Sequence, residues 1–195
     1  MAAPPQGMGS GTKFPLLRTM MFIDGGYFEH WIENICKIPK NKYHFSNFSE
    51  IISKNAFSAL RNPLLIRTYY YDGLPDPKYP EYQKTKKFHD ELNRNFVNYE
   101  VKSITIDKVD GVFKQKGVDT ILALDMLEKA LSNQYDVAIL VAGDRDHTPI
   151  AKAVKNSGKQ VFGVYYEESY SKELINEFDI GYVLEKKREG TLAKH

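Results

Sequence analysis

The segment "ILVAGDRDHTPI" (Ile139–Ile150) places two carboxylates directly after the most apolar run of the chain. Its first half predicts a buried strand, and its second half predicts a helix with Thr148 as the capping residue and Pro149 as the first helical residue. Asp144 and Asp146 lie between the two elements. Acids at this point serve either the turn and the helix that follows or a bound cation.

The same order of strand, turn and helix recurs along the chain. Apolar or β-rich runs predict strands at 19–26, 62–73, 98–106, 136–143, 159–166 and 181–186. Apolar residues at helical spacing predict helices at 27–36, 48–60, 86–96, 118–131, 148–158 and 171–178. Strands that alternate with helices favour a parallel sheet with helices on both faces, and therefore the α/β class.

The length of 195 residues fits one domain, which we expect at 19–187. Residues 1–18 are rich in Pro, Gly and Ser and contain no apolar secretory segment, so we expect a flexible tail there. A short C-terminal tail is expected at 188–195, and residues 37–50 are expected to form a polar and aromatic insertion.

The composition is that of a globular protein in water, with 42% hydrophobic and 27% charged residues. No apolar run is long enough to cross a bilayer, so no membrane partner is expected. The single cysteine, Cys36, excludes an internal disulfide and fits a reducing compartment, for which we expect the cytoplasm. The net charge of +2 neither demands nor excludes nucleic acid.

Three predicted strands end in an aspartate: Asp24, Asp72 and Asp144. Ligands of parallel sheets bind beyond the carboxyl ends of the strands, where these side chains would gather. For Asp24, a role in a turn and a role as a metal ligand are equally favoured. For Asp72, which precedes Gly73, a role in a turn is favoured. Asp144 fits a metal ligand better, because Mg²⁺ and Mn²⁺ prefer carboxylates.

The predicted helix at 118–131 contains two further acids, Asp119 and Asp125. At about 100° per residue, their side chains point roughly 120° apart, so they cannot easily share one ion. We expect Asp119 to be the ligand, although acids also favour a first helical turn. Asp125 is left as a supporting group, and His147 as a general base, a metal neighbour or, most commonly, a plain residue at a helix start.

Several other kinds of site lack the residues they need. The chain has no His/Cys cluster for zinc and no phosphate-binding glycine motif or serine-hydrolase motif. Phosphatases of the haloacid dehalogenase type also use strand-end aspartates, but they need a second Asp two residues after the first. That position is Gly26 in this chain.

The segment 76–89 interleaves lysines with aromatic residues. Lysines and rings together are typical of surfaces that bind single-stranded nucleic acid, but a solvated loop leading into an amphipathic helix explains the charges slightly better. The candidate RNA contacts in this segment are Lys84, Lys86, Lys87, Tyr79 and Tyr82.

Three motifs together, "MFIDGGYF", "KGVDTILALDML" and "AILVAGDRDHTPIAKAVKNSGKQV", resemble the NYN domains of the LabA-like group in the PIN-like nuclease superfamily. The resemblance covers about residues 20–185. It implies a PIN-like three-layer sandwich around a mostly parallel sheet, an acidic pocket that binds Mg²⁺ or Mn²⁺, and phosphodiester hydrolysis, usually of RNA. The acids of the family fall on Asp24, Asp119, Asp144 and Asp146.

The sequence departs from the family at two positions near these acids. Many members have Asn where this chain has Tyr27, and Phe where it has His147. Both positions adjoin the predicted pocket, so these departures affect its finer geometry.

The leading hypothesis is a metal-dependent ribonuclease, an endoribonuclease acting on single-stranded RNA. Asp24, Asp119 and Asp144 would bind metal, and Asp146 would bind a second ion or orient the attacking water. Lys116 and Arg145 would hold backbone phosphates at the rim of the pocket. The alternative is a regulatory module that binds nucleic acid or protein with little or no turnover, and a homodimer is left open.

Overall fold

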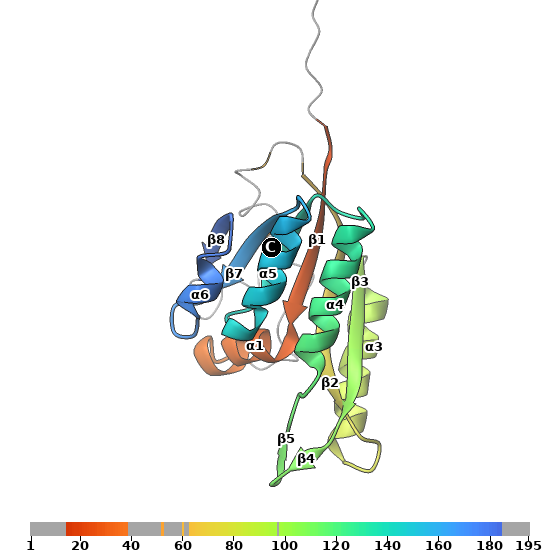
Figure 1. The fold of residues 1–195 in the computed structure, drawn as a ribbon. Helices are drawn as coiled ribbons and strands as arrows, with labels where there is room; N and C mark the ends of the chain where they lie inside the picture. Colours follow the sequence, from red (N-terminus) through yellow and green to blue (C-terminus); the bar gives the residue numbers. More distant parts are fainter. Residues whose placement is uncertain (1–14, 39–51, 53–59, 61–62, 97, 185–195) are drawn as a thin grey trace, which may run out of the picture.

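The computed structural model describes residues 15–38, 52, 60, 63–96 and 98–184, and a six-stranded parallel sheet forms its centre (Figure 1). The strands are β1 Leu17–Asp24, β2 Pro63–Pro75, β3 Tyr99–Ile106, β6 Val137–Val141, β7 Gln160–Tyr165 and β8 Ile180–Val183. Their order in the sheet is β3-β2-β1-β6-β7-β8, so β1 and β6 occupy the centre.

Helices cover both faces of this sheet. They are α1 Gly25–His30, the π-helix η1 Trp31–Ile35, α3 Glu81–Asn95, α4 Val118–Leu131, the 3₁₀ turn η4 Arg145–His147, α5 Thr148–Asn156 and α6 Lys172–Ile175. The first three pack on one face and α4, α5 and α6 on the other, so the expected three-layer α/β architecture is confirmed.

The central strand β1 is buried on both faces. Met21 and Ile23 face the layer of α1 and α3, whereas Met20 and Phe22 face α4 and α5. This two-sided burial explains why the sequence shows a continuous apolar run here instead of alternation.

Parallel pairing sets the heights at which the strands end. Ile23 pairs with Val141 on β6, and Asp24 pairs with Tyr71 on β2. The carboxyl ends of β1 and β6 therefore lie together, beside the N-terminal ends of α4 and α5 at the lower edge in Figure 1. This edge carries the acids that the sequence singles out.

Several boundaries differ from the predicted ones. β1 begins at Leu17, inside the stretch expected to be a tail, and α5 begins at Thr148, one residue early. β2 continues past Asp72 to Pro75 because it stays paired with β3. The predicted helix 48–60, most of the insertion, residues 1–14 of the first tail and the whole C-terminal tail lie outside the described residues.

One element was missed entirely, the antiparallel hairpin of β4 Lys108–Val109 and β5 Val112–Phe113. Its turn residues Asp110 and Gly111 have positive φ angles of 53° and 77°, as a tight hairpin turn requires. An Asp-Gly pair between β-forming residues is the signal that would have predicted it. The hairpin projects beyond the edge that carries the acids (Figure 1).

In the described part of the chain, no helix combines the length and the apolar character needed to span a bilayer. The single cysteine, Cys36, is buried.

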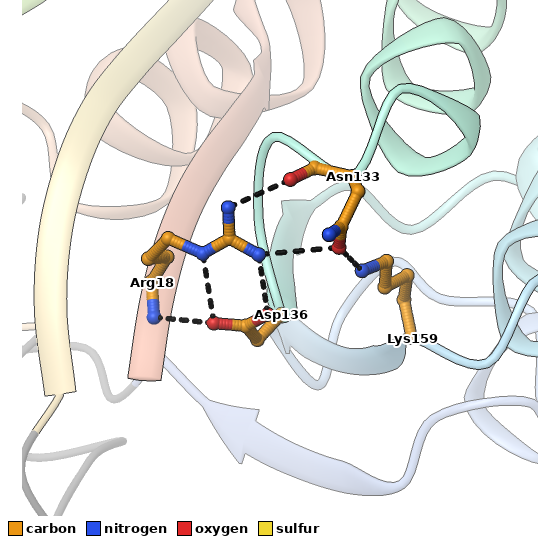
Figure 2. A network of polar contacts seen from close by, with 4 residues as sticks. All are labelled: Arg18, Asn133, Asp136 and Lys159. Atoms are coloured by element: carbon orange, nitrogen blue, oxygen red, sulfur yellow. Dashed lines mark hydrogen bonds and ion pairs between the residues drawn. The ribbon is translucent and has the colours of Figure 1, made fainter. Parts of the chain in front are cut away.

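The opposite edge of the sheet is held by Arg18 and Asp136 (Figure 2). The Arg18 guanidinium donates to both carboxylate oxygens of Asp136, at 3.1 and 2.8 Å, and the Arg18 backbone N–H donates to the same carboxylate at 2.9 Å. Arg18 also donates to the carbonyl oxygen of Asn133 at 2.7 Å. This contact ties the start of β1 to the residues that precede β6.

We expect Asp136→Asn to lower the free energy of unfolding by about 1 kcal/mol at pH 7, since the Arg18 and Asp136 side chains are 36% and 31% exposed and solvent weakens the pair. The side-chain hydrogen bond from Arg18 lowers the pKa of Asp136. The stabilisation is therefore present above about pH 4, the value for an unfolded aspartate, and is lost as the pH falls through the lowered folded value. Urea unfolding of both proteins at pH 7 and in acid tests this, and equal stability at pH 7 would contradict it.

Candidate functional site

The site begins with Asp24, the last residue of β1 and the cap of α1. Its side chain is 7% exposed, and its Oδ1 accepts a hydrogen bond from the Tyr27 backbone N–H at 3.1 Å. A Cβ at Gly25 would lie 2.5 Å from the Tyr71 carbonyl oxygen, so the sharp exit from the sheet needs glycine there. The local sequence therefore fixes one carboxylate oxygen and leaves Oδ2 to face His147.

His147 and Asp119 reach the same point from two other elements. His147 ends the η4 turn and is 1% exposed, and its Nε2 lies 3.4 Å from Asp24 Oδ2. Asp119, in the first turn of α4, places its Oδ1 3.7 Å from the same nitrogen. One ligand atom from each of the three side chains lies within 4.8 Å of the others.

Electrostatics confirm that these groups act on one another. Burial raises the pKa of Asp119, and the nearby negative charges of Asp24, Asp144 and Asp146 raise it further. Burial alone would lower the pKa of His147, but the hydrogen bond and charge of Asp24 outweigh it and raise the pKa. Negative charge is thus concentrated at this edge in a way that favours a cation.

Asp144 and Asp146 lie at the same edge of the sheet but on its exposed surface. Both side chains are exposed on the turn after β6, and both raise the pKa of Asp119 through their charge. Among the described residues, neither belongs to the group whose ligand atoms approach within 4.8 Å. The structure thus brings together two of the four predicted ligands, Asp24 and Asp119, and adds His147 to them.

Asp72 belongs to a different environment. It is buried beneath α3, and its Oδ2 lies 2.9 Å from His89 Nε2 on that helix. Its Oδ1 accepts hydrogen bonds from the Gly73 backbone at 2.7 Å and from Gln115 at 3.1 Å. Asp72 lies within β2, so the predicted turn role is wrong, and its contacts instead tie β2 to α3 and to Gln115.

Asp125 also lies apart from the cluster. Its Oδ2 accepts a hydrogen bond from the Tyr71 hydroxyl at 3.0 Å, and Lys129 lies 3.4 Å from its Oδ1. Both contacts are made between α4 and β2 or within α4, so Asp125 holds the helix on the sheet.

Tyr27 connects the site to the loop after β7. Its hydroxyl donates to the Ser169 carbonyl at 2.6 Å and accepts from the Tyr166 backbone N–H at 3.1 Å. The Ser171 backbone N–H donates in turn to the Gly143 carbonyl at 2.8 Å. Tyr27 therefore fixes a loop that holds the turn carrying Asp144.

The candidate lysines Lys84, Lys86 and Lys87 lie on α3, whose N-terminal end is near the same edge of the sheet (Figure 1). Lys86 is paired with Asp90 at 3.0 Å and Lys87 with Glu91 at 3.9 Å, whereas Lys84 is exposed. Most of this charge is compensated within the helix, as for a solvated helix face.

The rings of this segment are half-buried. Tyr79 packs edge-on against Phe113 with centroids 5.2 Å apart, and the Lys108 ammonium lies 5.0 Å from its ring centroid. The Tyr79 ring thus anchors the β4–β5 hairpin. Tyr82 lies one turn further along the chain, at the start of α3.

Lys116 and Arg145 flank the acidic cluster. Lys116 is exposed in the loop before α4. The Arg145 side chain is 71% exposed and lies 3.9 Å from Glu173. An open groove beside it is lined by Arg145, Asp146, Thr148, Pro149 and Glu173.

His147 is the residue whose place sequence reasoning left open. A histidine at a helix start is common, and only the folded chain shows that it is buried between two carboxylates. A partial signal was present, since His147 is the histidine nearest in sequence to the strand-end acids. The expected capping role of Thr148 is wrong, because its Oγ1 is buried and has no hydrogen-bond partner.

An all-parallel α/β sheet with acids at its carboxyl edge is consistent with the PIN-like class of fold. The family model for the NYN domain matches residues 18–185, and the chain therefore belongs to the NYN domain family. No curated protein sequence matches the chain.

Among solved structures, the chain is similar to a protein of unknown function from Vibrio parahaemolyticus RIMD 2210633. The two are 18% identical with a TM-score of 0.57, over 87% of this chain and 94% of the other. At this identity the likeness supports the fold alone.

The donor set fits a divalent cation. Two carboxylates and an imidazole from three elements approach one point, and carboxylates placed this close repel one another unless a positive charge lies between them. Asp24, Asp119 and His147 are the residues that could hold the ion.

We expect Asp119→Asn to raise the melting temperature of the metal-free protein at pH 7. The pKa of Asp119 is raised, so its ionised form is less favourable in the folded state than in the unfolded state. The same change should remove most of the rise in melting temperature that Mn²⁺ causes in the wild type, because an ion stabilises only the state that binds it. Thermal melts with and without Mn²⁺ test this, with Asp136→Asn as the control at the far edge.

Proposed function

We propose that this NYN domain protein is a ribonuclease that hydrolyses single-stranded RNA with Mg²⁺ or Mn²⁺. The observation that carries the proposal is the convergence of Asp24, Asp119 and His147 at the carboxyl edge of the sheet. NYN domains are nuclease-like, and the family match covers this whole region. Membership of the LabA-like group, endonucleolytic cleavage and a cytoplasmic location remain predictions from the sequence.

The buried members of the site are arranged to hold charge in a fixed place. Asp24 is oriented by the Tyr27 backbone N–H and His147 is enclosed by the protein, so neither side chain must reorganise when a ligand binds. A divalent cation held here supplies an activated water and relieves charge on the leaving oxygen of a phosphodiester.

The exposed members suit contact with the substrate. Asp144 and Asp146 are solvent-accessible beside the cluster, where a carboxylate can orient a water molecule or accept its proton. In this assignment Asp146, which lines the groove next to Arg145, faces the bound nucleic acid.

Basic residues on both sides of the acids support RNA as the substrate. Lys116 and Arg145 lie on the two loops that flank the cluster and can each contact a backbone phosphate. Lys84 and Tyr82 on α3 would extend this path, together with Lys86, Lys87 and Tyr79 if RNA displaces their present contacts.

A binding module without turnover is the second candidate. It is favoured by the positions of Asp144 and Asp146, which lie outside the compact group of ligand atoms. Such a protein would bind RNA with metal present but leave it intact.

We expect generic single-stranded RNA to be cleaved in the presence of Mn²⁺ and to remain intact with EDTA. Asp24→Asn and Asp144→Asn should each slow cleavage by at least about a hundredfold, equivalent to roughly 2.7 kcal/mol of barrier. Initial rates on an end-labelled RNA provide the measurement.

Asp136→Asn is the matched control for this assay, because it makes the same chemical change at the opposite edge of the sheet. It should retain the wild-type rate at a temperature where it is folded. Full activity of Asp144→Asn would show that Asp144 serves the turn and has no part in the reaction. RNA binding without cleavage by the wild type would favour the binding module.

We expect Lys116→Ala with Arg145→Ala to weaken RNA binding and to flatten its dependence on salt. Each lost phosphate contact on a single strand should reduce the slope of log K against log salt by about 0.7. Fluorescence anisotropy between low and moderate salt measures this. Lys159→Ala removes a positive charge at the far edge and serves as the control. An unchanged slope in the double variant would show that RNA does not contact Lys116 or Arg145. A variant with Lys84, Lys86 and Lys87 all replaced by Ala would then be tested.

A further inference from the structure

The burial of His147 separates this site from a surface cluster of acids. The imidazole is 1% exposed, yet its Nε2 points between Asp24 and Asp119, which come from β1 and α4. A nitrogen enclosed by protein on all other sides and directed between two carboxylates is placed to bind whatever those carboxylates bind.

The distances among the three side chains are compatible with a shared ion. Nε2 lies 3.4 Å from Asp24 Oδ2 and 3.7 Å from Asp119 Oδ1, both longer than the usual hydrogen bond of about 2.7–3.2 Å. Neighbouring ligands on an octahedral cation with bonds of about 2.1 Å lie roughly 3.0 Å apart. Small side-chain movements would therefore bring all three atoms onto one ion.

We propose that His147 is a direct nitrogen ligand of the metal and that it gives the site a preference for Mn²⁺-type transition ions over Mg²⁺. Imidazole nitrogen binds first-row transition ions well, whereas Mg²⁺ takes oxygen ligands and keeps much of its water. The proposal rests on the metal site of the proposed function, and it adds the ligand and the selectivity that this chain's histidine supplies.

The other buried histidine provides a matched control. His89 is 5% exposed and lies 2.9 Å from Asp72, so it also forms a buried imidazole–carboxylate pair. It lies on the opposite face of the sheet and has no second carboxylate in the metal-ligating group. Replacing it changes an equally buried imidazole without touching the site.

The test measures metal binding and not cleavage. Mn²⁺ bound to the full chain is examined by pulsed electron paramagnetic resonance, in which a directly bound imidazole gives ¹⁴N modulation. We expect this modulation in the wild type, its replacement by a ¹⁵N pattern after histidine labelling, and its loss in His147→Gln. His89→Gln should retain it. The labelling experiment needs no substitution and therefore stands even if a variant fails to fold.

Affinity provides a second, independent readout. By calorimetry we expect His147→Gln to weaken Mn²⁺ binding at least tenfold and Mg²⁺ binding less than threefold. The ratio of Mn²⁺ affinity to Mg²⁺ affinity should therefore fall. His89→Gln should leave both affinities unchanged.

The outcomes are distinct. Mn²⁺ bound without nitrogen modulation, or modulation that persists in His147→Gln, would overturn the proposal. Tighter Mn²⁺ binding by His147→Gln would also overturn it and would identify His147 as a positive charge that competes with the ion. Nitrogen modulation without RNA cleavage would support the ligand and contradict only the proposed activity. Unchanged Mn²⁺ binding by Asp24→Asn would show that Mn²⁺ does not bind at the Asp24 cluster and would contradict the proposed metal site.

Discussion

The parallel pairing of β1 with β2 on one side and β6 on the other is the constraint on which the rest of the structure depends. Both faces of β1 are covered by helices, so a shift in register would move its side chains out of their packing. With Ile23 opposite Val141, the chain exits of β1 and β6 are fixed at the same height. Asp24 and His147 meet as a consequence of that register.

The charged groups at the two edges of the sheet are arranged in opposite ways. At one edge Asp136 receives several hydrogen bonds from Arg18, and its pKa is lowered (Figure 2). At the other edge acids face one another, and the pKa of Asp119 is raised. The first arrangement stabilises the fold, whereas the second concentrates negative charge at some cost to stability, which is typical of sites built to bind.

The two departures from the family have structural roles near the acids. The Tyr27 backbone N–H donates to the capping carboxylate of Asp24, and the Tyr27 hydroxyl donates to the Ser169 carbonyl in the loop after β7. His147 fills a buried position between Asp24 and Asp119 with a group that can bind metal. This chain therefore has a pocket edge with more hydrogen-bonding and ligand capacity than Phe at position 147 would allow, because an imidazole has two ring nitrogens.

The sequence by itself determined the α/β class, the six strands and the edge at which Asp24, Asp119, Asp144 and Asp146 gather, because apolar periodicity and strand-end residues are local patterns. It also contained the Asp110–Gly111 signal of the hairpin that was missed. Only the tertiary structure decided that Asp24 and Asp119 converge while Asp144 and Asp146 lie outside the group of ligand atoms, that Asp72 contacts His89 on α3, and that His147 is buried beside Asp24 and Asp119. Those outcomes depend on how residues distant in the sequence, such as Asp24 and His147, are brought together by strand register and helix packing, which no local pattern records.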